Sequence, residues 1–121
     1  MGNYPPHVYL IPEDRRNEQL ANGFVNHYKV DVRRLDVMPV AGGWSHVLKI
    51  FEDEYTQRLR ENPSDHVVML IDYDGNYDNR RKKFEDAIPD DLKQRVFVVG
   101  SKVTPEAMKK VMAKDLSLIH I

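Results

Sequence analysis

The chain of 121 residues contains no cysteine. Disulfide bridges, thiol nucleophiles and cysteine-based zinc sites are therefore excluded, and the composition fits the reducing cytoplasm. The chain also lacks any apolar run near the ~18 residues that a transmembrane helix requires. We therefore expect a cytoplasmic protein that has no membrane partner.

A strong charge imbalance is also absent. The 18 lysine and arginine residues nearly balance the 19 aspartate and glutamate residues, which gives a formal net charge of −1. A nucleic-acid partner would therefore have to bind a local basic patch. With 41% hydrophobic and 31% charged residues, the composition is that of one globular domain, which we place at residues 1–115.

The last six residues, with the sequence LSLIHI, continue no periodicity of the charged helical segment before them. They resemble the translation of an adapter used in sequencing libraries. We therefore expect residues 116–121 to be a non-native tail, and the natural chain to continue past Asp115.

Four short apolar runs alternate along the chain with segments of helical periodicity. Such alternation indicates an α/β fold with three layers, in which helices cover a mainly parallel four-stranded sheet. The expected order is β-α-β-α-β-α-β-α, with right-handed crossovers. The predicted strands are His7–Ile11, Val30–Met38, Val67–Ile71 and Val96–Gly100, and the predicted helices are Asn17–Tyr28, Trp44–Glu61, Asn79–Ala87 and a segment that begins near Thr104.

The third apolar run leads directly into two carboxylates, Asp72 and Asp74. Its five consecutive apolar residues are typical of a strand buried on both faces, so the carboxylates would lie at the carboxyl end of that strand. Two carboxylates placed together repel each other unless a cation lies between them. Oxygen ligands of this kind suit a magnesium ion, so we predict that Asp72 and Asp74 bind Mg²⁺ or, in its place, Mn²⁺.

A third acidic residue, Glu13, follows the first apolar run. In a parallel sheet all carboxyl ends meet at one edge, so Glu13 can converge with the two aspartates. Gly42-Gly43 after the second run and Ser101-Lys102 after the fourth would line the same edge. Acidic residues at this edge also commonly cap helix N-termini, and for Glu13 that alternative remains open.

These features together resemble a Toprim domain, which topoisomerases, bacterial primases and overcoming-lysogenization-defect nucleases share. The resemblance covers about residues 8–100 and rests on a Glu after the first strand, a glycine turn after the second and Asp-x-Asp after the third. It implies a Toprim and Rossmann-like fold in which Glu13 is the general acid and base. It further implies that Asp72 and Asp74 hold Mg²⁺ opposite a phosphate of DNA or RNA, as in a nuclease.

The chain departs from the Toprim pattern at one position, because Asp14 stands where glycine usually follows the glutamate. Glu18 is only a loose match to the next expected acidic residue. These 121 residues contain no tyrosine-nucleophile domain, helicase or zinc module. The resemblance therefore indicates a small stand-alone Toprim-like protein and leaves open whether it is an enzyme.

Basic residues occur close to the predicted site in the sequence. They could contact a phosphate backbone, although a charged run such as residues 80–83 is more commonly a solvated helix face. The candidates for phosphate contacts are Arg15, Arg16, Arg80, Arg81 and Lys102.

Other interpretations fit the same residues less well. A phosphoreceiver domain also has acidic groups after its first and third strands, but its hydroxyl and lysine follow different strands, whereas Ser101 and Lys102 are adjacent. An EF-hand is rejected because Tyr77 and Lys83 stand where glycine and glutamate are required. A haloacid-dehalogenase phosphatase would carry Asp-x-Asp after the first strand. A non-catalytic regulatory or interaction module on the same fold remains the competing hypothesis.

Overall fold

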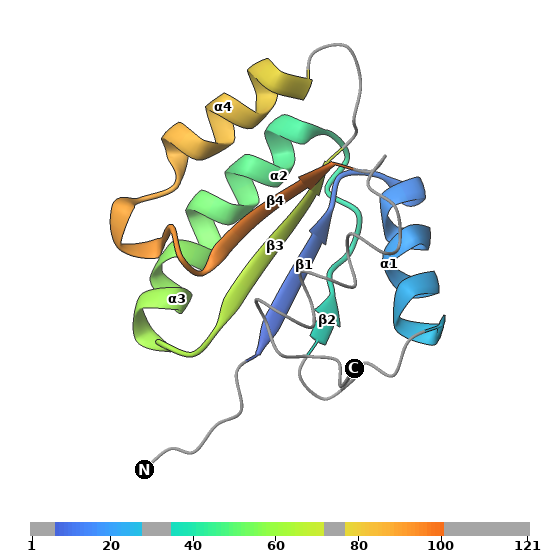
Figure 1. The fold of residues 1–121 in the computed structure, drawn as a ribbon, viewed down its shortest axis with the longest axis horizontal. Helices are drawn as coiled ribbons and strands as arrows, with labels where there is room; N and C mark the ends of the chain where they lie inside the picture. The colour runs from blue at the N-terminus through green and yellow to red at the C-terminus, as the bar shows by residue number, and fades with distance from the viewer. Residues whose placement is uncertain (1–6, 28–34, 72–76, 101–121) are drawn as a thin grey trace.

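The computed structural model describes residues 7–27, 35–71 and 77–100. Four strands form one sheet in the order β2-β1-β3-β4, and every neighbouring pair is parallel (Figure 1). The predicted parallel α/β sheet is therefore confirmed, and strands and helices alternate throughout the described residues. The strands are β1 (Val8–Pro12), β2 (Leu35–Val37), β3 (His66–Ile71) and β4 (Val96–Gly100).

The helices agree with the predicted segments wherever the structure describes them. The predicted helix that begins near Thr104 and the predicted tail lie outside the described residues. The helical elements are α1 (Arg15–His27), α2 (Trp44–Ile50), the π-helical turn η1 (Phe51–Tyr55), α3 (Thr56–Glu61), α4 (Tyr77–Ala87) and the 3-10 turn η2 (Asp90–Leu92).

Helices lie on both sides of the sheet, which gives the three layers expected. Alternate residues of β3, beginning with Val67, join the main core with residues of α2, α3 and α4. Val68 and Leu70 are equally buried and point to the opposite face, because successive side chains of a strand alternate. Helix α1 packs on β1 and β2, and Figure 1 shows it on the side away from α2, α3 and α4. Burial on both faces explains the uninterrupted apolar run of β3.

The predicted helix over residues 44–61 is present, but it is not a regular α-helix. Its buried side chains Val47, Phe51, Tyr55 and Leu59 recur at every fourth residue. In an α-helix such a series drifts by about 40° at each step, because one turn takes 3.6 residues. The wider π-helical turn at Phe51–Tyr55 takes up this drift and keeps all four side chains on the sheet.

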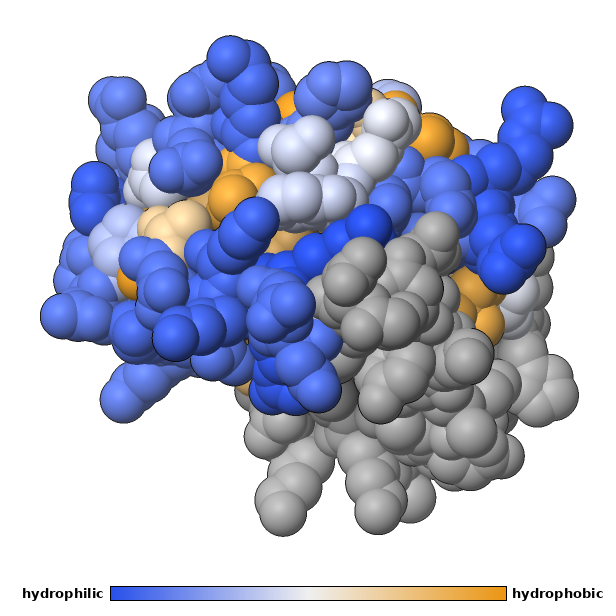
Figure 2. All heavy atoms as spheres, turned by 90° about the horizontal axis from the view of Figure 1, so that it is seen from above, coloured by the Kyte–Doolittle hydropathy of each residue, from blue (hydrophilic) through white to orange (hydrophobic). Residues whose placement is uncertain are grey.

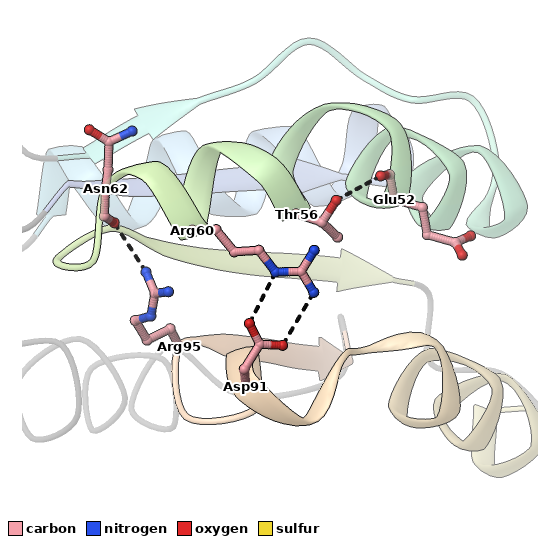
Figure 3. A network of polar contacts seen from close by, with 6 residues as sticks. All are labelled: Glu52, Thr56, Arg60, Asn62, Asp91 and Arg95. Carbon is pink, nitrogen blue, oxygen red and sulfur yellow. Dashed lines mark hydrogen bonds and ion pairs between the residues drawn. The ribbon is translucent and has the colours of Figure 1, made fainter.

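The amino end of the sheet is closed by a network of arginines (Figure 3). Arg60 donates through Nε and Nη2 to the two carboxylate oxygens of Asp91, at 3.0 and 3.2 Å. The Nη1 group of Arg95 donates to the carbonyls of Asn62 and Asp65, both at 3.1 Å. These bonds tie the end of α3 and the chain before β3 to the segment that leads into β4.

A second polar cluster lies at the same end, beside β1. Arg58 lies over the rings of Tyr9 and Tyr55, with its guanidinium carbon 5.3 and 5.7 Å from the ring centroids. Burial raises the pKa of Tyr55, and the charge of Arg58 opposes that effect. His7 Nε2 lies 2.6 Å from Asp36 Oδ2, which links the start of β1 to the edge strand β2.

Candidate functional site

The order of the strands singles out one place on the carboxyl edge of the sheet. The chain passes from β1 outward to β2, then returns across β1 to β3 and continues to β4. The direction therefore reverses between β1 and β3. In open α/β sheets ligands bind outside the carboxyl ends of the strands at such a reversal. The segments that follow β1 and β3 are consequently the ones to inspect for chemistry.

Glu13, the predicted general acid and base, is the first residue after β1. Its N–H donates to the carbonyl of Leu70 in β3 at 2.8 Å, so its backbone is fixed against the neighbouring strand. The residue is buried, with 7% of its surface exposed. A carboxylate with so little exposure is a strong candidate for a functional group, because burying a charge is costly unless it is compensated.

The predicted metal ligands Asp72 and Asp74 lie outside the described residues. The residue directly before Asp72 is Ile71, which ends β3. Because Pro12 pairs with Leu70 in the parallel register, Ile71 lies beside the point where the chain reaches Glu13. Within the described part of the chain, no group of three or more acidic or histidine side chains is placed to hold a metal ion.

A glycine loop lies directly against Glu13. The N–H groups of Gly42 and Gly43 both donate to the carbonyl of Glu13, at 2.9 and 3.3 Å. Their φ angles are +89° and +139°, values that side chains with a Cβ rarely adopt. The neighbouring Ala41 N–H donates to the carbonyl of Pro12 at 3.0 Å. Glu13 and the Gly42-Gly43 turn thus lie together, as the parallel arrangement predicts.

Asp14, the departure from the Toprim pattern, has a structural role. Its Oδ1 accepts the N–H of Asn17 at 2.9 Å, and Asn17 Oδ1 accepts the N–H of Asp14 at 3.2 Å. This reciprocal pair caps the N-terminus of α1. Because Asp14 fills the capping role, the open alternative for Glu13 is met by its neighbour.

The candidate phosphate ligands fall into different environments. Arg15 and Arg16 are exposed on the first turn of α1, next to Glu13 in the sequence. On α4, Arg81 forms an ion pair with Glu85, with Nε 3.0 Å from Oε1. The guanidinium carbon of Arg80 lies 5.5 Å from the centroid of the Trp44 ring. Lys102 lies outside the described residues.

Sequence reasoning missed one residue of this surface and underestimated another. Lys83 Nζ lies 5.0 Å from the Trp44 centroid, so two cations of α4 share one ring. Trp44 was expected in the core, but it is only partly buried against it. The signal was present in the spacing, because residues 80 and 83 are neighbours on a helix surface. Which ring they would meet could not be read from the helix alone.

Seen from above, the described surface is mostly hydrophilic, and apolar atoms show only in small separate patches (Figure 2). Among the described residues, Val40 is the only large apolar side chain classed as exposed. No described helix has both the length and the apolar composition needed to cross a membrane. Charge and polarity rather than an apolar surface therefore characterise the described exterior.

Comparison of the chain with protein-family models, with curated proteins and with solved structures found no match. The functional assignment consequently rests on the fold and on the residues of the chain.

Proposed function

We propose that the carboxyl edge between β1 and β3 is a Toprim-like, Mg²⁺-dependent site for phosphodiester chemistry on DNA or RNA. The observation that supports it most is the position of Glu13. This buried carboxylate directly follows β1 at the reversal of strand order, and its backbone is bonded on both sides by β3 and by the glycine loop. Such rigid placement is what a catalytic group requires.

The donor set suits the proposed metal. Carboxylate oxygens are hard ligands of the kind that Mg²⁺ prefers, and one or two of them with waters make a typical site. Asp72 and Asp74 would hold the ion. Once bound, Mg²⁺ would neutralise charge on the phosphate oxygens. The role that remains for the chain is proton transfer, and Glu13 is the group placed to accept a proton from the nucleophile or to return one to the leaving oxygen.

The glycine loop contributes the shape of the site. Residues without a Cβ at positions 42 and 43 let the main chain approach Glu13 closely. The same property lets a phosphate group approach the loop without meeting a side chain. Arg15 and Arg16 on the first turn of α1 would add positive charge on the solvent side.

The decisive experiment compares cleavage by the parent chain and by Glu13→Gln. Labelled single-stranded DNA, duplex DNA and RNA would be incubated with MgCl₂, and the rate of cleavage measured. Loss of the general acid and base should lower the rate by about 10²- to 10⁴-fold. Glu52→Gln, an exposed change on the π-helical turn, is the matched control and should retain the parent rate.

Metal binding is tested separately by following amide NMR signals during titration with Mg²⁺. Signals of residues near positions 72 and 74 should shift in the parent chain and lose that response in Asp72→Asn. The absence of any shift would contradict the metal site. Mg²⁺-dependent shifts combined with equal rates for the parent and Glu13→Gln would favour a non-catalytic module instead.

A further inference from the structure

Trp44, Arg80 and Lys83 form a cluster that is not explained by the proposed chemistry of Glu13. Both cations lie over the same indole ring, at 5.5 Å for the guanidinium carbon and 5.0 Å for the ammonium nitrogen. We propose that these three residues, the basic clamp, bind a backbone phosphate of the nucleic acid that the proposed function takes as substrate. In the clamp Trp44 is a positioning residue, and the two cations are the phosphate ligands.

The fold places the clamp at the same edge as Glu13. Trp44 directly follows Gly43, whose N–H donates to the carbonyl of Glu13. Figure 1 shows that α2 and α4 both begin near the end at which the strand arrows terminate. A phosphate on the clamp would therefore lie along the rim of the proposed site rather than on a remote surface.

The face of α4 that carries the clamp is anchored in the core. Phe84 is fully buried, and its ring centroid lies 6.4 Å from that of Trp44. Arg80 lies one turn before Phe84, so it is held on the same side of the helix. This anchoring separates the four basic residues of α4 into different roles. Arg81 is paired with Glu85, whereas Lys82 is exposed.

The charges of the clamp point to an anionic ligand. Two cations that share one ring repel each other, and the ring quadrupole offsets only part of that repulsion. A phosphate between them removes the repulsion and accepts hydrogen bonds from both. Contact with Trp44 also restricts the long side chains of Arg80 and Lys83 in advance. Less conformational freedom is then lost when the phosphate binds.

Contacts of this kind fix a strand in position but carry no sequence information. The clamp should therefore bind single-stranded and duplex nucleic acid of any sequence, with a strong dependence on salt. Each phosphate contact contributes about 0.7 to 0.9 to the slope of log affinity against log salt concentration. The slope is the quantity that distinguishes a phosphate ligand from a residue that only supports the fold.

The test measures binding of a fluorescein-labelled twelve-nucleotide DNA to the full chain by anisotropy, with EDTA present to prevent cleavage. Lys83→Gln should weaken binding about five- to tenfold at 0.1 M salt and reduce the salt slope by close to one. Lys82→Gln removes the same charge from an exposed neighbouring position and is the matched control. It should change affinity by less than twofold. Equal effects of the two changes would overturn the clamp.

A second pair of variants tests the positioning role of the ring. Trp44→Leu keeps every charge, so it should weaken binding severalfold while leaving the salt slope unchanged. Trp44→Phe keeps an aromatic face and should restore most of the affinity. If Trp44→Phe binds no better than Trp44→Leu, the ring does not position the cations. Because the chain has a single tryptophan, its fluorescence in the parent should also respond directly when the oligonucleotide binds.

The two proposals fail in different ways. Normal cleavage that depends on Glu13, together with equal binding by Lys83→Gln and Lys82→Gln, would remove the clamp and retain the proposed chemistry. Binding that depends on Lys83 without any Mg²⁺-dependent cleavage would retain the clamp as a nucleic-acid contact and remove the chemistry. Failure of the parent chain to bind any oligonucleotide would overturn both.

Discussion

The two ends of the sheet are built from different kinds of bonds. At the amino end, side chains make the connections, with Arg60 bonded to Asp91 and Arg95 bonded to two carbonyls. At the carboxyl end, the bonds between the loops are made by main-chain groups, as when Gly42 and Gly43 donate to the carbonyl of Glu13. The contrast separates an end whose side chains hold the fold together from an end whose loops are held by their backbones.

This difference bears directly on where function can reside. A side chain that is committed to the fold cannot also move a proton or contact a substrate. When the main chain organises the loops, carboxylates and cations at that end can serve another purpose. The comparison therefore predicts that changes at the carboxyl end alter activity, whereas changes at the amino end alter stability alone.

The largest effect on the comparison is expected from Gly43→Ala. The φ of +139° and ψ of +154° at Gly43 lie in a region that is essentially restricted to glycine. The change should lower the free energy of unfolding by about 1–3 kcal/mol, and it should also displace the loop from Glu13 and reduce Mg²⁺-dependent cleavage. Urea denaturation and the cleavage assay would measure the two effects.

Gly23→Ala is the matched control for that change. Gly23 lies inside α1, and an added Cβ would meet nothing within 4 Å. Alanine at a helical position should stabilise the chain by about 0.5–1 kcal/mol and leave cleavage unaltered. If both glycine changes had the same sign, the backbone of the loop would not be strained in the way inferred here.

An intermediate effect is expected at the amino end from Arg95→Met. The substitution removes two hydrogen bonds from a charged donor and keeps the apolar stem. We expect the free energy of unfolding to fall by about 1–2 kcal/mol, because the site is partly exposed and the freed carbonyls can reach water. Cleavage by the folded variant should equal that of the parent. A selective loss of activity would contradict the division between the two ends.

The smallest effect is expected from Arg60→Gln. The hydrogen bond and charge of Arg60 lower the pKa of Asp91 below its usual value. The associated stability is present above the unfolded pKa and is lost as the pH falls through the folded pKa. In Arg60→Gln the carboxyl signal of Asp91 should titrate at its ordinary value in NMR. Thermal stability near neutral pH should hardly change, because the pair is fully exposed.

Much of this fold could be predicted from local patterns. The apolar run of β3, the last strand β4 and the helix over residues 44–61 were all recognisable, because burial and periodicity leave a direct mark on the sequence. The meeting of Glu13 with the glycine turn was also predictable, since parallel strands bring their carboxyl ends to one edge. The edge strand β2 was harder. Of the predicted Val30–Met38 strand, the structure places Leu35–Val37 in the sheet, and residues 30–34 lie outside the described residues.

The features that escaped prediction depend on contacts between distant segments. The order β2-β1-β3-β4 is set by how strands pair, which no single strand encodes. The role of Asp14 as a helix cap was hidden because the Toprim pattern drew attention to it as an exception. Trp44 fitted a core position by its spacing. Its contact with Arg80 and Lys83 exists only because α4 packs beside α2.

The π-helical turn at Phe51–Tyr55 has a consequence for how this gene can change over time. Substitutions there alter only a side chain, but the loss of one residue would convert the turn to regular α-helix and rotate everything after it by about 100°. Leu59 would then leave the core, and Arg60 would no longer reach Asp91. The spacing of residues in this helix is thus constrained independently of their identity. Single-residue insertions and deletions should consequently be purged from it in related sequences, even where the amino acids themselves vary.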